Sequence, residues 1–182
     1  RMKSPKAFLE VNGRSFTELI AGVYSGFVDE MVLVLNGAFC APRWLQSLVR
    51  LPENMIYITN DKPHLDRIHS LLLGARASYA RKAFVHNVDQ PFVTREVIQK
   101  LLLAQNSGDV IIPSFNHQHG HPVLINEQVL TRLRTTTCSD ITLKEFYSSF
   151  DRHFVDVNDP SILCNINTPE DLERELTHKI AI

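Results

Sequence analysis

Four short segments of the sequence carry side chains that could do chemistry, and the first is the basic opening. Arg1 and Lys6 stand on either side of Pro5. Two cations at this spacing could neutralise the phosphates of a nucleotide, provided that a glycine-rich loop with free backbone N–H groups lay beside them. The alternative is a solvated tail, in which Lys6 would be exposed. Even as a phosphate ligand, Lys6 is expected to have no partner when no nucleotide is bound.

The second segment is an apolar run that ends in the carboxylate Asp89 and is followed by Pro91. Residues 83–88 are apolar at nearly every position, which predicts a parallel strand covered on both faces, and Pro91 cannot continue a central ladder. Ligands of open α/β sheets bind outside the carboxyl ends of the strands. Since Mg²⁺ is held by one or two carboxylates together with substrate phosphates, Asp89 is a candidate metal ligand. The alternative is a cap for the helix that Thr94 begins.

The third segment contains His117, His119 and His121, which alternate as residues on one face of a strand do. Such a face could ligate a transition metal. Gly120 and Pro122 favour a bend over a flat strand, however, and no carboxylate or thiolate is adjacent. We therefore do not expect a metal at these histidines.

The fourth segment ends in two amides, Asn165 and Asn167, directly before a strong helix start. Thr168 is placed as N-cap, Pro169 at the first helical position and Asp171 three residues after the cap. The amides could face a ligand, or the segment could be a helix start and nothing else.

The elements that must position these segments alternate between helical and strand patterns, which predicts an α/β protein. Residues 15–18 form a capping box for the first helix. Right-handed crossovers then give a Rossmann-like three-layer sandwich with a mostly parallel mixed sheet, and the length favours a single domain over residues 1–182. We expect strands at 31–35, 55–59, 83–88, 109–113, 122–125, 154–157 and 162–166, and helices at 15–26, 64–79, 94–105, 126–133, 141–150 and from 169 onward.

The composition excludes several classes of protein. A net charge of -1 over 182 residues gives no field that would gather nucleic acid or an anionic membrane. No apolar run approaches the roughly 18 residues that a membrane span needs. The three cysteines are widely spaced and lack a C-x-x-C pair, which disfavours a disulfide framework or a zinc ribbon. We expect a cytoplasmic protein.

Taken together, these segments resemble the MobA-like nucleotidyltransferases, the family that includes the guanylyl- and cytidylyltransferases of molybdenum cofactor synthesis. The resemblance spans nearly the whole chain, because five motifs occur in family order at family spacing. They are Arg1-Met2-x-x-Pro5-Lys6, Ser70-Leu71-x-x-Gly74, Val88-Asp89-Gln90-Pro91, Gly120-His121-Pro122-Val123-Leu124 and Asn167-Thr168-Pro169-Glu170-Asp171-Leu172.

The resemblance implies transfer of a nucleoside monophosphate from a nucleoside triphosphate, CTP or GTP, to a small phosphorylated acceptor such as molybdopterin. Pyrophosphate leaves, and Mg²⁺ is the cofactor. It implies the following roles: Arg1, Lys6 and Asp89 catalytic; Asn60, Ser70 and Gly74 toward the nucleotide; Gly120, His121 and Pro122 toward the acceptor; Asp89 and Asn165 toward the metal. It also implies a strand before Arg1, parallel to the strand over 83–88 and central in the sheet.

The sequence departs from the family pattern at the amides. Many members carry Asp where this chain has Asn165 or Asn167, and a neutral amide is a weaker Mg²⁺ ligand than a carboxylate. An alternative is therefore a nucleotide- or cofactor-binding module of the same fold with weakened catalysis. An NAD-dependent dehydrogenase is a poorer reading of the chain, because no G-x-G-x-x-G follows a predicted strand.

Overall fold

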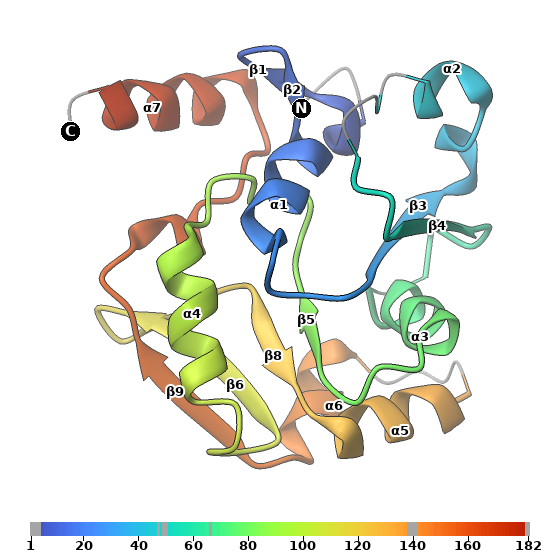
Figure 1. Ribbon diagram of the computed structural model, residues 1–182, viewed down its shortest axis with the longest axis vertical. Helices are drawn as coiled ribbons and strands as arrows, with labels where there is room; N and C mark the ends of the chain where they lie inside the picture. Colours follow the sequence, from blue (N-terminus) through green and yellow to red (C-terminus); the bar gives the residue numbers. More distant parts are fainter. Residues whose placement is uncertain (1–4, 47, 49–50, 66, 138–141, 181–182) are drawn as a thin grey trace.

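The computed structural model describes residues 5–46, 48, 51–65, 67–137 and 142–180. Helices and strands alternate along most of it (Figure 1). The strands are β1 (Glu10–Val11), β2 (Arg14–Ser15), β3 (Met31–Asn36), β4 (Met55–Asn60), β5 (Ala83–Val85), β6 (Val110–Phe115), β7 (Gln118–His119), β8 (Val123–Ile125) and β9 (Arg152–Asp156). The α-helices are α1 (Phe16–Tyr24), α2 (Pro42–Leu45), α3 (Arg67–Ala77), α4 (Arg95–Leu103), α5 (Glu127–Thr135), α6 (Leu143–Ser148) and α7 (Pro169–Ile180). Three 3₁₀ turns are η1 (Lys6–Phe8), η2 (Gly37–Phe39) and η3 (Pro160–Leu163).

The strands of the central layer form a mixed arrangement. β3 and β4 pair in parallel. In the larger sheet β8 lies between β5 and β6 and runs antiparallel to both, while β9 pairs with β6 in parallel. β5, β6 and β9 therefore point the same way, and their carboxyl ends lie at one edge of the sheet. The expected α/β class with a mixed sheet is confirmed.

Alternating side chains of β6 and β8 send their apolar groups to opposite faces, as strand geometry requires. Val110 and Ile125 pack with α3, α5 and α6, whereas Ile111 and Leu124 pack with α1 and α4. Each of these four side chains is almost completely buried. Helices therefore cover both faces of the sheet, which confirms the three-layer sandwich (Figure 1).

Local signals account for the starts of two elements. Ser15 Oγ accepts the Glu18 N–H at 3.1 Å while Glu18 Oε2 accepts the Ser15 N–H at 2.7 Å, so the expected capping box begins α1. Between β6 and β7, Asn116 and His117 both have positive φ angles, which gives a two-residue hairpin of the type that Asn favours. The chain therefore turns at His117 and does not continue as a flat strand.

One predicted strand is wrong and another is shorter than expected. The strand over 83–88 is β5, which ends at Val85 and pairs with β8 in antiparallel orientation instead of the expected parallel one. Residues 162–166 were expected to be extended, but Pro160–Leu163 is the 3₁₀ turn η3, and the segment after it is irregular. Asp159 explains the difference, because its Oδ1 accepts the Ser161 N–H at 2.9 Å and starts the turn just before Ile162. The irregular segment carries Asn165 and Asn167 toward the carboxyl edge of β5.

The expected strand before Arg1 stays a prediction. Among the described strands, β3 pairs only with β4, and β5 pairs only with β8. In the described part of the chain, no helix combines the length and the apolar character that crossing a membrane requires.

Candidate active site

The turn that follows β5 presents Asp89 at the carboxyl edge of the sheet. The Gln90 N–H donates to the Asn87 carbonyl at 3.1 Å, which closes a four-residue turn around Asp89. The Ile166 N–H donates to the Asp89 carbonyl at 2.8 Å and ties the turn to the segment before α7. The carboxylate itself remains partly accessible, with 16% of the side chain exposed.

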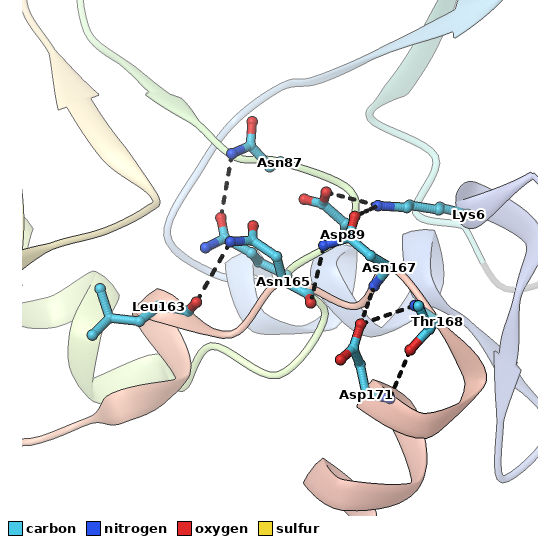
Figure 2. A network of polar contacts seen from close by, with 9 residues as sticks. Lys6, Asn87, Asp89, Leu163, Asn165, Asn167, Thr168 and Asp171 are labelled. Atoms are coloured by element: carbon cyan, nitrogen blue, oxygen red, sulfur yellow. Dashed lines mark hydrogen bonds and ion pairs between the residues drawn. The ribbon is translucent and has the colours of Figure 1, made fainter. Parts of the chain in front are cut away.

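Three polar side chains from distant parts of the sequence meet at this edge (Figure 2). Lys6 Nζ lies 2.9 Å from Asp89 Oδ2 and 2.6 Å from Asn167 Oδ1. The lysine side chain is 28% exposed, so the ion pair borders solvent. A carboxylate oxygen and an amide oxygen thus converge on one cation. Asp89 is not the cap of α4, since the N-cap of that helix is Thr94.

Lys6 reaches this position because the residues after it are buried. Ala7 and Phe8 pack against Leu35 of β3, and the Phe8 ring lies 5.2 Å from the Trp44 ring. Thr17 in α1 donates its hydroxyl to the Ala7 carbonyl at 2.9 Å. The basic opening is therefore anchored over the sheet edge from Lys6 onward, and the expectation of a solvated tail without partners is wrong for Lys6. Arg1 lies outside the described residues.

Asn167 is positioned by the cap of α7. Asp171 Oδ2 accepts the N–H groups of Asn167 and Thr168, each at 2.9 Å, and Thr168 Oγ1 accepts the Asp171 N–H at 3.2 Å. These backbone N–H groups favour the charged carboxylate and lower the pKa of Asp171. The expected helix start is confirmed, and it also aims the Asn167 side chain at Lys6.

The amide that lies close to Asp89 is Asn167, whereas Asn165 was expected as the metal ligand. Asn165 directs its side-chain N–H₂ toward the Leu163 carbonyl at 3.5 Å, and its own carbonyl accepts from Asn167 Nδ2 at 3.4 Å (Figure 2). Asn167 is the amide that shares the lysine ammonium with Asp89. A role for Asn165 toward a metal stays a prediction.

The donor set fits a hard divalent cation. Mg²⁺ prefers oxygen ligands and is commonly held by one or two carboxylates together with phosphate oxygens of a substrate. Asp89 and Asn167 supply two oxygens that already face a positive charge. No group of three or more His, Cys, Asp or Glu residues capable of holding a metal occurs within the described ranges, so a cation here needs ligands from the substrate as well.

The residues expected to face the nucleotide gather at the end of β4. Asn60, which is 4% exposed, donates from Nδ2 to Ser70 Oγ at 3.0 Å and accepts the Lys62 N–H at 2.8 Å. Gly74 packs against β3, because a Cβ there would lie 3.4 Å from the Val34 methyl group. The structure therefore joins β4 to α3 through Asn60 and Ser70, and it gives Gly74 a packing role. Contact with a nucleotide stays a prediction for all three.

The residues expected to face the acceptor are joined to the same edge through Ile162. The Ile162 carbonyl accepts the His121 N–H at 3.1 Å and Gln90 Nε2 at 2.8 Å. A Cβ on Gly120 would lie 2.7 Å from the Ile162 carbonyl carbon, so only glycine permits this approach. Pro122 follows and leads into β8. Burial lowers the pKa of His121, the charge of Arg67 lowers it further, and the charge of Asp89 opposes both.

The sequence analysis gave no role to His86, which contacts the Asp89 turn, or to Gln90, which closes that turn. The ring nitrogens of His86 lie 2.8 Å from the Tyr24 hydroxyl and 2.8 Å from the Gln90 carbonyl. Gln90 is 2% exposed. A histidine inside an apolar run was the one signal available. Tyr24, the partner of His86, lies 62 residues away in the sequence, and Ile162, the partner of Gln90, lies 72 residues away. A local sequence pattern cannot predict such contacts.

A cleft of about 840 Å³ lies elsewhere, and its lining includes Lys82, Asp109 and Asp151, which directly precede β5, β6 and β9. It is therefore at the amino ends of these strands, opposite Asp89. None of the predicted site residues that the structure describes lines it.

A comparison with protein families matches residues 1–154 to the MobA-like NTP transferase domain. Two curated relatives cover most of the chain. A protein of Natranaerobius thermophilus is 25% identical over 198 residues, which span 96% of this chain and 88% of the relative. A protein of Methanosarcina acetivorans is 27% identical over 184 residues, which span 92% of this chain and 80% of the relative. Both are named "Probable molybdenum cofactor guanylyltransferase".

Solved structures share the fold at lower identity. The crystal structure of Rv0371c from Mycobacterium tuberculosis H37Rv superposes with a TM-score of 0.76 at 18% identity and covers 97% of this chain and 92% of its own. A second structure of that protein, in complex with manganese, gives a TM-score of 0.70 at 17% identity, with 95% and 91% coverage. These similarities extend over nearly the entire sandwich.

Proposed function

The chain belongs to the MobA-like NTP transferase family, and on that basis we propose that it transfers GMP from GTP to a phosphorylated acceptor of the molybdopterin type. The observation that carries the proposal is the convergence of Lys6, Asp89 and Asn167 at the carboxyl edge of β5. A cation, a carboxylate and an amide at one sheet edge suit a triphosphate and its counter-ion.

In the proposed reaction an acceptor phosphate oxygen attacks the α-phosphorus of the nucleotide. A bond forms between that oxygen and the α-phosphorus, the bond from the α-phosphorus to the bridging oxygen breaks, and pyrophosphate leaves with the electron pair. The protein's part is to position both substrates and to neutralise charge that builds in the transition state.

Lys6 changes partners in this scheme. Without a nucleotide its ammonium binds Asp89 and Asn167. With a nucleotide it binds the triphosphate as a compact point charge and stabilises the developing charge on the leaving pyrophosphate. We expect Arg1 to act beside it.

Asp89 and Asn167 would hold Mg²⁺, and Asn165 would be a further ligand. When bound, the cation neutralises charge between the phosphates and orients them for displacement. The manganese complex of Rv0371c, a protein of the same fold, is consistent with a divalent cation in this role.

The remaining expected residues would lie on the two sides of this centre. Asn60, Ser70 and Gly74 belong to β4 and α3 and would approach the nucleoside. Gly120, His121 and Pro122 precede β8 and would approach the acceptor. The choice of GTP rests on the names of the two curated relatives.

The test is Mg²⁺-dependent release of pyrophosphate from GTP in the presence of molybdopterin, with CTP, ATP and UTP as alternatives. We expect turnover with GTP and none after removal of divalent cations. Binding of GTP and Mg²⁺ without pyrophosphate release would instead indicate a binding module of the same fold. Turnover with CTP alone would support the transferase activity but would show that the nucleotide is CTP and not GTP.

A further inference from the structure

The side chain of His86 forms a hydrogen bond with the backbone of the turn that carries Asp89. His86 Nε2 lies 2.8 Å from the carbonyl oxygen of Gln90. A carbonyl can only accept, so this nitrogen carries the hydrogen of the neutral ring. Nδ1 is then an acceptor, and it receives the hydroxyl hydrogen of Tyr24 over 2.8 Å. The two contacts together specify one tautomer of His86.

Tyr24 is placed to enforce this tautomer. It is the last residue of α1, is 6% exposed, and lies with its ring 5.3 Å from that of Phe84 in β5. Burial raises the pKa of its hydroxyl, which therefore remains a donor. The Tyr24 and His86 rings meet edge to face, at 5.6 Å and 80°. The pair spans the space between α1 and the Asp89 turn.

The His86 contact completes a set of anchors on both sides of Asp89. The Asp89 carbonyl accepts from Ile166, the Gln90 N–H donates to Asn87, and the Gln90 carbonyl accepts from His86. Gln90 also donates its side chain to the Ile162 carbonyl at 2.8 Å. Because these hydrogen bonds fix the backbone on both sides of Asp89, the direction of its carboxylate depends on them.

We propose that His86, fixed in its Nε2–H tautomer by the Gln90 carbonyl and the Tyr24 hydroxyl, is a positioning residue that aims Asp89 at the cation and phosphate site. Neither side chain has a hydrogen bond to Lys6 or Asn167. His86 acts through the backbone of the turn, and Tyr24 acts through His86. The inference rests on the proposed function for its catalytic consequence, although the tautomer and the effect on metal binding can be measured without turnover.

Removal of the contact distinguishes positioning from support of the fold. His86→Gln retains an N–H₂ donor that can reach the Gln90 carbonyl, whereas His86→Leu retains only bulk. Tyr24→Phe removes one oxygen atom and leaves the ring packing in place. Leu130→Ala serves as the control of comparable destabilisation, because Leu130 is 2% exposed and lies in the core on the other face of the sheet.

The first measurement is the ¹⁵N spectrum of the His86 ring in the full-length chain at pH 7. We expect the Nε2–H tautomer in the wild-type chain, and in Tyr24→Phe a changed Nδ1 resonance, because Nδ1 loses the hydrogen bond from the Tyr24 hydroxyl. An Nδ1–H tautomer in the wild type would overturn the inference at once, whatever the enzyme's activity.

The second measurement is Mn²⁺ affinity by electron paramagnetic resonance, paired with the Mg²⁺ concentration that half-activates pyrophosphate release. Outer contacts of metal ligands typically contribute about 10- to 100-fold to affinity or activity. We expect His86→Leu to weaken Mn²⁺ binding by about tenfold, and His86→Gln and Leu130→Ala to remain near the wild type.

Equal Mn²⁺ affinities in His86→Leu and Leu130→Ala would contradict a positioning role and would show that His86 only stabilises the fold. If His86→Leu does not fold, Tyr24→Phe carries the same comparison. A wild-type chain without nucleotidyl transfer would refute the proposed function, while the tautomer and the Mn²⁺ series would still decide the role of His86.

Discussion

The ammonium of Lys6 lies 2.9 Å from Asp89 Oδ2, although 83 residues separate the two in the sequence. In the absence of substrate, the protein's own cation thus sits where the carboxylate would meet a metal or its phosphates. The pair borders solvent, with 28% and 16% of the two side chains exposed. Pairs of this kind contribute about 1 kcal/mol or less to stability, so the arrangement matters more for binding than for folding.

Replacement of Asp89 by Asn should remove most of the turnover and leave the fold intact. The change keeps the shape of the side chain but removes the charge that attracts the cation. We expect a fall in kcat/KM of about 100-fold or more, the usual effect of a lost electrostatic group at a reacting centre. Steady-state pyrophosphate release measures it. Asp156→Asn is the matched control, since Asp156 is an exposed carboxylate at the end of β9; equal effects of the two changes would contradict the role of Asp89.

Lys6→Met should affect cation binding and turnover in opposite directions. Loss of the ammonium frees Asp89 and Asn167, so Mn²⁺ affinity without nucleotide should rise by about two- to fivefold, the equivalent of a solvent-bordering ion pair. Loss of a charge-assisted contact to the triphosphate costs about 1.5 to 3 kcal/mol, hence roughly a 10- to 150-fold lower kcat/KM. Titration with Mn²⁺ and steady-state kinetics measure the two effects.

Lys144→Met, which removes an exposed lysine from α6, is the control for the Lys6 variant. It should leave both quantities unchanged. Unchanged kcat/KM in Lys6→Met at saturating Mg²⁺ would argue against a phosphate contact of Lys6.

Replacing each of the two amides before α7 by Asp should show which of them lies closer to the metal. Asn167→Asp adds a carboxylate where the amide oxygen already faces a cation at 2.6 Å, so the Mg²⁺ concentration for half-activation should fall. Asn165→Asp should have the smaller effect, because that side chain is directed to the Leu163 carbonyl. Mg²⁺ titration of pyrophosphate release compares them. A larger effect at Asn165 would restore it as the metal-side amide.

Local patterns were sufficient to predict most of the fold. The capping box at Ser15, the alternation of helix and strand, and the Thr168 cap are all encoded within a few residues, and each is present in the structure. Asp89 was predicted at the end of a strand over 83–88, whereas β5 ends at Val85 and Asp89 lies in the turn that follows it. The strand over 162–166 failed because apolar residues were weighed above Asp159 and Pro160, which start a 3₁₀ turn.

The partners within the site could not be predicted in this way. Lys6 meets Asp89 and Asn167 across 83 and 161 residues, and these distances depend on how η1 and α7 pack against the sheet. Either amide could have faced Asp89 from the sequence alone. The choice is made by the turn after η3 and by the cap of α7, which together set the direction of each side chain.

Two glycines expected at the site should respond oppositely to alanine. In Gly120→Ala the new methyl group would meet the Ile162 carbonyl carbon at 2.7 Å, and overpacking of this kind typically costs about 1 to 3 kcal/mol. In Gly74→Ala the methyl group would contact Val34 at 3.4 Å, while the helix gains up to about 1 kcal/mol in propensity. Denaturant unfolding should show a loss for the first and little loss or a gain for the second. Equal losses would contradict the close approach at Gly120.

The pH dependence of stability should show the buried state of His86. Burial is the main cause that lowers its pKa from 6.5 to about 4, with a smaller contribution from the charge of His121, while the hydrogen bond to Gln90 and the charge of Asp89 oppose the shift. Between these two values the unfolded chain binds more protons than the folded one, so the free energy of unfolding falls as the pH falls from about 6.5 toward 4. Between pH 7 and 4.5 we expect a loss of about 2 to 3 kcal/mol from this residue. Urea unfolding at pH 7, 6, 5 and 4.5 measures the slope, and His86→Gln, which does not titrate, should show a shallower one. Parallel slopes for the two proteins would mean that His86 takes up its proton as readily in the folded chain as in the unfolded one, which would contradict burial as the cause of its lowered pKa.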